Sequence, residues 1–285
     1  MGAPMARRLL AAGYQVTVHD VRPQAMTEIC RDGAAPADSP ASAASQADVV
    51  ITMLPDPRAV EDAVYGERGL GDAMRAGQVL LEMTSSHPAT TRRIAAHLTA
   101  RGVKILDAPV SGGVPGAREG TLCIMVGGSA EVLEACRPIL GQLGRKIVHV
   151  GGAPGDGDVA KTINNMLSAT TMWSVAEALA LSARAGLDAE RLFEAVNHSS
   201  GRSYTTEVKI PLILERRFAA AFTVGQFLKD LNICLDLADE LGVPMLLASM
   251  LRQGWRVAAR DGMAESDNTE VVRLLERWAG VVPDH

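Results

Sequence analysis

The spacing of apolar residues changes along the chain and divides the sequence into two parts. Up to about residue 150, short apolar runs alternate with segments of helical periodicity. Strands are predicted over 14–20, 48–55, 78–83, 103–108, 122–127 and 145–150, and helices over 1–13, 23–31, 39–46, 57–65, 89–101 and 130–143. Alternation of this kind indicates a parallel sheet with helices packed on its faces.

The second part of the chain shows helical periodicity only. Helices are predicted over about 157–185 and then over 189–196, 227–241, 244–259 and 269–279. The first of them would be roughly 40 Å long at a rise of about 1.5 Å per residue. We therefore expect two domains, an α/β domain over residues 1–150 and an all-helical domain over residues 151–285, joined by this long helix.

The composition narrows the class of protein. A chain of 285 residues that is 47% hydrophobic and 21% charged is typical of a globular protein with two sizeable cores. A net charge of −5 argues against nucleic-acid binding, which usually needs a basic surface. The most apolar stretch, 166–181, is broken by Ser168, Ser174 and Glu177, so we expect a helix buried in protein and no membrane partner.

The cysteines and histidines indicate neither a metal site nor a disulfide framework. The four cysteines are scattered without a CxxC pair, so we expect small buried side chains in a reducing cytoplasm and no signal peptide. No His, Asp or Glu spacing suits a metal ion. His198 could act as a base, but residues 197–202 also have the pattern of an ordinary helix end and loop. His19 and His149 end predicted strands and are expected to be structural.

Several turns follow predicted strands at what would be one edge of the sheet. These turns are Leu54–Pro55, residues 84–86 and residues 109–113. Ligands of parallel sheets bind beyond the carboxyl ends of the strands. Within the last turn, Ser111-Gly112-Gly113 could offer a hydroxyl and successive backbone N–H groups to a carboxylate. An ordinary turn is the alternative for these three residues taken alone.

A glycine-rich turn at residues 151–157 leads directly into the long predicted helix. Lys161 and Asn165 are four residues apart near its start, so both side chains can face one site. The positive end of the helix dipole would lower the pKa of a lysine that is also shielded from water. Such a lysine suits general acid/base chemistry, and Asn165 could orient a neighbouring hydroxyl. A solvated lysine and a packing amide are the alternatives for the two residues taken separately.

The start of the chain has the pattern of the second half of a nucleotide-binding βαβ unit. A helix over 1–13 is followed by a strand that ends at Asp20, where such units place the carboxylate that binds the ribose. Gly2 could be the last glycine of a G-x-G-x-x-G turn, although an ordinary helix start is the simpler interpretation of a single glycine.

Four motifs together resemble those of the β-hydroxyacid dehydrogenase family, which includes 3-hydroxyisobutyrate dehydrogenase and tartronate semialdehyde reductase. They are the end of a nucleotide-binding signature at 1–6, a substrate motif at 107–113, a catalytic motif at 152–165 and a cofactor-proximal motif at 227–231. The resemblance covers essentially the whole chain. It implies a Rossmann-type first domain and hydride transfer between a nicotinamide cofactor and a small hydroxy acid.

The resemblance also assigns residues and an assembly. Lys161 is the implied catalytic acid/base. The residues implied to contact the substrate are Ser111, Gly112, Gly113 and Asn165, and those implied to approach the cofactor are Gly2, Asp20, Leu54, Pro55, Ser85 and Lys229. A homodimer or homotetramer built through the helical half is implied as well.

Asp20 bears on the choice of cofactor. A carboxylate at the end of this strand accepts hydrogen bonds from the ribose 2′-hydroxyl and repels a 2′-phosphate. Family members that prefer NADP tend to show Asn-Arg-Thr where this chain has Asp20-Val21-Arg22. We therefore expect NAD, and the neighbouring Arg22 leaves NADP open.

The sequence departs from the family pattern at its start. The first strand and the Gly-x-Gly turn of the family would precede Met1, and they are missing here. Losing a central strand exposes backbone groups of its neighbours, at a cost comparable to the total stability of a domain, about 5–15 kcal/mol. One hypothesis is a start codon assigned too late; the alternative is a truncated chain with weak or absent cofactor binding.

Three functions are consistent with these residues. The first is an NAD-dependent dehydrogenase of a 3-hydroxyisobutyrate-like acid, which the stretch 197–204 mildly favours. The second is an NADP-linked reductase of short aldehyde acids such as tartronate semialdehyde, or of imines; imine reductases of this superfamily usually lack a lysine at the position of Lys161. The third is a truncated, non-catalytic nucleotide-binding relative, which the missing strand favours and the Lys161–Asn165 pair opposes.

Overall fold

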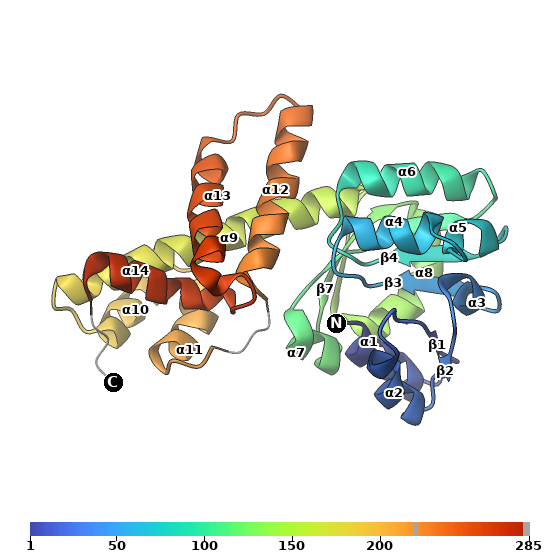
Figure 1. Cartoon of the computed structure of the whole chain (residues 1–285), viewed down its shortest axis with the longest axis horizontal. Coiled ribbons are helices and arrows are strands. Elements are labelled where there is room, and N and C mark those ends of the chain that lie inside the picture. The colour runs from blue at the N-terminus through green and yellow to red at the C-terminus, as the bar shows by residue number, and fades with distance from the viewer. Residues whose placement is uncertain (219–221, 282–285) are drawn as a thin grey trace. The chain divides into compact units, whose positions relative to one another are not determined.

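Contacts along the chain define two units in the computed structural model, which describes residues 1–218 and 222–281. The first unit is Met1–Lys161 and the second is Thr162–His285. The helix α9 (Asp156–Arg184) begins in the first unit and continues in the second (Figure 1). The first unit combines strands and helices, whereas the described part of the second is helical. The predicted order, an α/β Rossmann-type half followed by a helical half with a long helix between, is confirmed.

The main sheet of the first unit has six strands. They are β3 (Val49–Thr52), β4 (Val79–Glu82), β5 (Lys104–Asp107), β6 (Val110–Ser111), β7 (Cys123–Gly128) and β8 (Lys146–Gly151). The order of hydrogen-bonded strands across the sheet is β3-β4-β5-β7-β6, and β8 also pairs with β7. The pairs β3–β4, β4–β5 and β7–β8 are parallel, as predicted.

The prediction of a wholly parallel sheet is wrong at β7, which runs antiparallel to both β5 and β6. β6 follows β5 after only Ala108 and Pro109, and the helix α7 (Gly113–Glu119) then reverses the chain. Because Pro109 has no N–H, it cannot donate to a ladder, but its carbonyl accepts a hydrogen bond from the Met125 N–H at 3.0 Å. The reversal therefore makes β7 the antiparallel partner of both preceding strands.

A separate two-stranded parallel sheet is formed by β1 (Thr17–Val18) and β2 (Ala35–Pro36). The strand predicted over 14–20 is thus too long. Among residues 1–218 and 222–281, β1 and β3 are edge strands, and no ladder joins the two sheets. A strand is defined only where a partner lies alongside it, and the described partner of β1 spans two residues.

The helices of the first unit cover both faces of the main sheet. They are α1 (Gly2–Ala11), α2 (Pro23–Arg31), α3 (Pro40–Ala44), α4 (Pro57–Tyr65), α5 (Leu70–Ala73), α6 (Pro88–Thr99), α7 and α8 (Ala130–Leu143). Leu80 of β4 packs with α4, α5 and α6, whereas its neighbour Leu81 packs with α1 and α8. Successive side chains of a strand point to opposite faces, so β4 is buried on both.

The second unit is built from helices around one aromatic core. Besides α9 they are α10 (Ala189–Asn197), a π-helical turn (Thr205–Lys209), α11 (Ile210–Leu214), α12 (Val224–Glu240), α13 (Leu246–Ala258), a second π-helical turn (Ala259–Met263), a 3-10 turn (Asn268–Glu270) and α14 (Val271–Ala279). The predicted long helices agree within a few residues, but the elements at 205–214 were not predicted because such short turns show too little periodicity. No described helix is long and apolar enough to cross a membrane.

Trp255 lies at the centre of that core. Its ring packs at 5.5 Å from the Trp173 ring and at 5.0 Å from the Phe227 ring, measured between centroids. A side chain at Gly254 would come within 2.6 Å of the Trp173 ring, so this position needs glycine for the two indoles to approach. The close packing of three aromatic rings makes this core sensitive to lost volume.

We expect Trp255→Ala to lower the free energy of unfolding by about 3–5 kcal/mol, because it leaves a cavity where a side chain with 0% exposure was. Urea unfolding followed by circular dichroism measures the change. The control is Trp278→Ala, whose side chain is 57% exposed and whose loss should change stability by no more than about 0.5 kcal/mol. Equal effects of the two substitutions would contradict this assignment of the core.

Candidate active site

The turns after β3 and β4 lie at one edge of the main sheet, because the two strands are parallel and in register. Leu54 and Pro55 follow β3, and Ser85 lies in the turn after β4. The Leu54 N–H donates to the Thr84 hydroxyl at 3.1 Å and so ties the two turns together. Three of the residues predicted to approach a cofactor are therefore held together at the edge where parallel sheets bind ligands.

The predicted substrate turn connects β6 to α7. Ser111 ends β6, Gly112 caps α7 with φ of 130° and Gly113 follows with φ of 62°. Both glycines are in conformations that other residues avoid, and a side chain at Gly112 would also meet Leu122 at 3.1 Å. The turn thus presents successive backbone N–H groups without side chains, which suits a carboxylate.

The start of α9 carries Lys161 and Asn165 one helical turn apart on one face. Both side chains are buried, Lys161 with 7% exposure and Asn165 with 4%. The hydrogen-bonding groups of Asn165 are used within the second unit, where its amide donates to the Asp230 carboxylate at 2.5 Å. A solvated lysine, the alternative from the sequence, does not fit the observed burial.

Asp230 is a residue to which the sequence analysis assigned no role. It lies in α12 with 3% exposure, and its second carboxylate oxygen is 3.1 Å from the Lys229 Nζ. One carboxylate therefore orients both the Asn165 amide and the Lys229 ammonium. The signal in the sequence was the adjacency of Lys229 and Asp230 in the motif at 227–231.

Asp107, at the end of β5, holds the first turn of α9. Its two carboxylate oxygens accept hydrogen bonds from the backbone N–H groups of Gly155 and Asp158, each at 2.9 Å. An acceptor from another element thus satisfies N–H groups that a helix start leaves without partners. The substrate motif contains Asp107, but the sequence alone did not predict this contact.

Two more buried acids lie beside Asp107. Glu82 ends β4, and its Oε1 accepts a hydrogen bond from the Thr84 N–H at 2.8 Å. Asp158, in the first turn of α9, accepts hydrogen bonds from the Thr91 hydroxyl at 2.6 Å and from the Ser86 N–H at 3.3 Å. The three carboxyl groups thus connect two strand ends to the helix that carries Lys161.

Burial changes the acidity of all three groups. It raises the pKa of Glu82 to about 8, with a further contribution from the charge of Asp107. Burial also raises the pKa of Asp158 well above its ordinary value, and the charges of Glu82 and Asp107 add to this effect. Burial raises the pKa of Asp107, although hydrogen bonds from Gly155 and Asp158 lower it in part. The cluster therefore binds protons at a pH where exposed carboxyl groups are ionised.

Gly2 and Asp20 are the remaining predicted cofactor residues. Gly2 begins α1, whose first turn has neither an acidic residue nor a side-chain cap, and a Cβ at Gly2 would meet no atom within 4 Å. Asp20 accepts hydrogen bonds from the Arg22 backbone N–H at 2.9 Å and from its guanidinium at 3.3 Å. Burial raises the pKa of Asp20, but these bonds lower it below its ordinary value, so the carboxylate stays charged.

These features fit a dinucleotide. The backbone N–H groups at the start of α1 can donate hydrogen bonds to a phosphate, and the ionised Asp20 can accept hydrogen bonds from ribose hydroxyls. Among the described residues, no group of three or more His, Cys, Asp and Glu could hold a metal ion.

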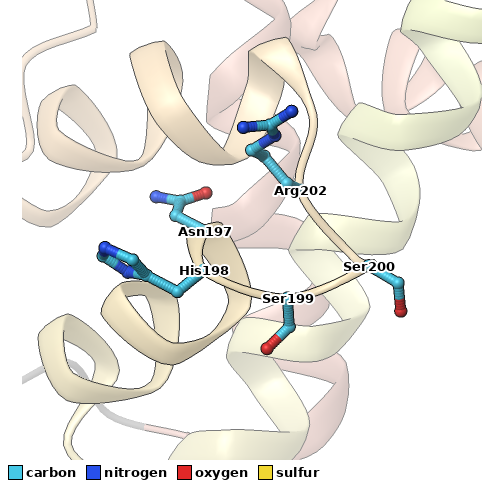
Figure 2. A pocket seen from close by; sticks show the side chains of 5 residues that line it. All are labelled: Asn197, His198, Ser199, Ser200 and Arg202. Atoms are coloured by element: carbon cyan, nitrogen blue, oxygen red, sulfur yellow. The ribbon is translucent and has the colours of Figure 1, made fainter.

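His198 does not belong to this arrangement. It follows α10, its ring Nδ1 pairs with the Glu194 carbonyl at 2.8 Å, and the side chain is exposed. A pocket is lined here by Asn197, His198, Ser199, Ser200 and Arg202. Figure 2 shows that these side chains spread around the turn and do not converge on one point. The interpretation of this segment as a helix end and loop fits the structure better than a catalytic base. His19 and His149 contact the backbone carbonyls of Ala37 and Gly128.

Comparisons with known proteins show the family of this chain. The family model described as the NAD binding domain of 6-phosphogluconate dehydrogenase matches residues 1–151. The model described as the NAD-binding domain of NADP-dependent 3-hydroxyisobutyrate dehydrogenase matches residues 155–275. A 3-hydroxyisobutyrate dehydrogenase of Pseudomonas aeruginosa is 39% identical over 98% of this chain and 96% of its own length. The chain belongs to the β-hydroxyacid dehydrogenase family.

Other members of the β-hydroxyacid dehydrogenase family cover the chain as fully. A 2-(hydroxymethyl)glutarate dehydrogenase of Eubacterium barkeri is 36% identical over 99% of this chain and 93% of its own length. The structure of a 3-hydroxyisobutyrate dehydrogenase of Mycobacterium tuberculosis with L-serine has a TM-score of 0.89 at 32% identity, over 96% of this chain and 95% of that one. The protein is thus an NAD(P)-dependent dehydrogenase of hydroxy acids, whose cofactor is NAD, with NADP as the alternative.

We expect Asp230→Ala to lower kcat/KM for the hydroxy acid about 10- to 100-fold. A hydrogen bond to a charged group is worth about 1.5–3 kcal/mol, and this substitution removes the acceptor of Asn165 and the partner of Lys229 together. Steady-state kinetics measure the loss. Asp236→Ala, an exposed acid of the same helix, is the control and should retain the original rate. An undiminished kcat/KM in Asp230→Ala would rule out its orienting role.

Proposed function

We propose that the enzyme oxidises a small 3-hydroxy acid of the 3-hydroxyisobutyrate type to its semialdehyde with NAD, and that Lys161 is the catalytic acid/base. The burial of this lysine near the start of α9, one turn before Asn165, is the observation that carries the proposal. Burial and the positive end of the helix dipole both favour the neutral amine over the ammonium. A base that must accept a proton near neutral pH needs this environment.

The chemistry follows from the proposed positions. When bound, NAD supplies the hydride acceptor. The Lys161 amine takes the proton of the substrate hydroxyl as hydride leaves the carbon that bears this hydroxyl. In the reverse direction the Lys161 ammonium returns the proton to the oxygen of the aldehyde. No net charge is then left on the substrate oxygen in either direction.

The remaining predicted residues would hold the substrate and the cofactor. Ser111, Gly112 and Gly113 would bind the carboxylate, which the successive backbone N–H groups of the turn support. Asn165, oriented by Asp230, would hold the hydroxyl beside Lys161. The proposed cofactor residues are Gly2, Asp20, Leu54, Pro55, Ser85 and Lys229. Residues 1–150 would form the dinucleotide-binding domain, and residues 151–285 the helical substrate and oligomerisation domain.

The identity of the acid rests on the relatives. Two of those described above are named 3-hydroxyisobutyrate dehydrogenase, and one of these was solved with L-serine. In both compounds the hydroxyl is on the carbon next to the one that bears the carboxylate, so both are 3-hydroxy acids. An NADP-linked reductase of short aldehyde acids is the second candidate, because a 2-hydroxy-3-oxopropionate reductase is 35% identical to this chain.

We also propose a homodimer or homotetramer formed through the helical unit. Large apolar side chains are exposed there, among them Leu246 at 85%, Met250 at 72% and Leu181 at 72%. Exposed apolar patches commonly mark protein interfaces.

The four cysteines form no disulfide in the structure, which supports a cytoplasmic location.

Lys161→Ala should lower kcat about 100- to 10,000-fold, the usual contribution of a general acid/base. NAD affinity, measured by fluorescence titration, should change little, since Lys161 acts on the substrate proton. Lys146→Ala, on an exposed position of β8, is the control. Retention of the original kcat in Lys161→Ala, with the fold intact, would overturn the proposed function.

Asp20→Ser should lower the ratio of kcat/KM with NAD to that with NADP about 10- to 100-fold. The substitution removes a charged acceptor for the ribose hydroxyl and the repulsion of a 2′-phosphate, while Arg22 remains to attract the phosphate. The ratio in Asp48→Ser, an exposed acid of the same unit, provides the comparison. An unchanged ratio in Asp20→Ser would mean that other residues select the cofactor.

A further inference from the structure

Three buried acids meet at the first turn of α9, and the proposed reaction uses none of them. Glu82 and Asp107 are exposed by 0% and Asp158 by 1%. Glu82 and Asp107 are register partners at the carboxyl ends of the parallel strands β4 and β5. Asp158 is three residues before Lys161 on α9, so it is a neighbour of Lys161 along the helix surface.

The contact between Asp107 and α9 leaves no free space. A Cβ at Gly157 would come within 2.8 Å of the Asp107 carboxylate and 2.6 Å of the Met125 carbonyl. A Cβ at Gly127 would come within 2.6 Å of the same carboxylate. Two glycines therefore allow the helix start to touch Asp107 directly, and any movement of the carboxylate moves the turn that precedes Lys161.

The cluster cannot hold three negative charges without a high cost. Two like charges in a poorly solvated site disfavour each other's ionised form, and a third adds to the effect. Asp107 has two backbone N–H donors and the positive end of a helix to stabilise its charge. Glu82 has no such support at its Oε2, which is buried without a hydrogen-bond partner among the described residues. The charge is therefore placed on Asp107, and a proton on the Glu82–Asp158 side.

We propose that Asp107 is a positioning residue that fixes the start of α9, and with it Lys161, and that a proton retained by Glu82 and Asp158 keeps this contact intact. The inference rests on the proposed role of Lys161. When the proton leaves, the cluster gains a negative charge. The resulting repulsion separates the Asp107 carboxylate from Asp158, whose backbone N–H is hydrogen-bonded to that carboxylate. The lysine then loses its alignment with the substrate hydroxyl.

Charged and polar groups surround the cluster on the elements packed against it. On α9 they are Asp156 and Lys161 beside Asp158. On α6, His87 caps the helix, and the Arg92 Nε lies 3.2 Å from where a Cβ of Gly155 would be. β3 contributes the uncharged Thr52, whose hydroxyl is 3.5 Å from Glu82, and β7 contributes the backbone of Met125 and Gly127. The cluster itself thus contains the three buried carboxyl groups, and the cations named here, Lys161 and Arg92, lie on α9 and α6.

A pH dependence of stability follows. Because the pKa of Glu82 is raised from 4.5 to about 8 in the folded protein, the folded state binds more protons than the unfolded state between these values. The stabilisation is complete below pH of about 4.5 and is lost as the pH rises through about 8. Glu82→Gln keeps this side chain neutral and should reduce the loss, while the raised pKa of Asp158 retains part of it. Thermal unfolding from pH 5 to pH 9 measures it, with the exposed Glu131→Gln as the control.

The decisive experiment is the pH profile of kcat in the direction of alcohol oxidation. In this direction Lys161 must be neutral, so its own titration lowers the rate only on the acid side. We expect the original enzyme to lose kcat above a pH of about 8, where Glu82 ionises. Glu82→Gln should move this loss upward by about one pH unit or more and leave kcat at neutral pH within about threefold. Glu131→Gln should leave the profile unchanged.

Asp107→Asn tests the positioning role itself. It replaces one acceptor oxygen with an NH2 group that faces a backbone N–H, so α9 should shift at its start. Displacements of about 1 Å can cost about 100-fold in rate, and we expect kcat to fall by this order with the KM for NAD within about twofold. If this variant does not fold, Glu82→Gln decides the question alone.

Infrared spectroscopy gives a readout that does not depend on activity. At neutral pH the protein should show the C=O stretch of a protonated carboxylic acid, and Glu82→Gln or Asp158→Asn should weaken it. A flat alkaline profile in the original enzyme, an unshifted loss in Glu82→Gln, or the absence of the protonated band would overturn the inference. These outcomes differ from failure of the proposed function, in which Lys161→Ala would itself retain turnover.

Discussion

The contact between the Asp107 carboxylate and the first turn of α9 is the constraint on which the candidate site depends. A helix start leaves N–H groups without partners, and here the end of a sheet strand supplies the acceptor. The same interaction fixes how closely the start of α9 approaches the strand ends. Gly127 and Gly157 have no side chains, so the helix start touches Asp107 without intervening space. Lys161 lies three residues after Asp158, whose backbone N–H belongs to this contact.

Burial determines the chemistry of that region. Three acids are enclosed where the strands β4 and β5 end, and water is excluded from them. Exclusion of water makes each charge more costly and each hydrogen bond stronger, so the acids bind protons at unusual pH. Lys161 is buried in the same region, with 7% exposure. The buried acids and this buried lysine therefore share the low polarity at the start of α9.

In the helical unit, a second buried carboxylate orients two polar side chains. Asp230 joins the Asn165 amide to the Lys229 ammonium within α9 and α12. A buried charge is tolerated there because it is paired and hydrogen-bonded. The aromatic core around Trp255 includes side chains of both helices. Family membership explains the motifs, but these contacts explain why the motif residues hold their positions.

Much of the organisation was readable from the sequence. Strand and helix periodicities predicted the α/β half, the helical half and the long helix, because periodic burial of apolar residues is a local property. The spacing of Lys161 and Asn165 also placed them on one helix face. Other features depended on contacts between residues far apart in the chain. The antiparallel course of β7, the two-residue length of β1, and the roles of Asp107, Glu82, Asp158 and Asp230 were decided only by tertiary structure. The hydrogen-bond partners of a buried charge come from residues far apart in the sequence, so no local sequence pattern predicts them.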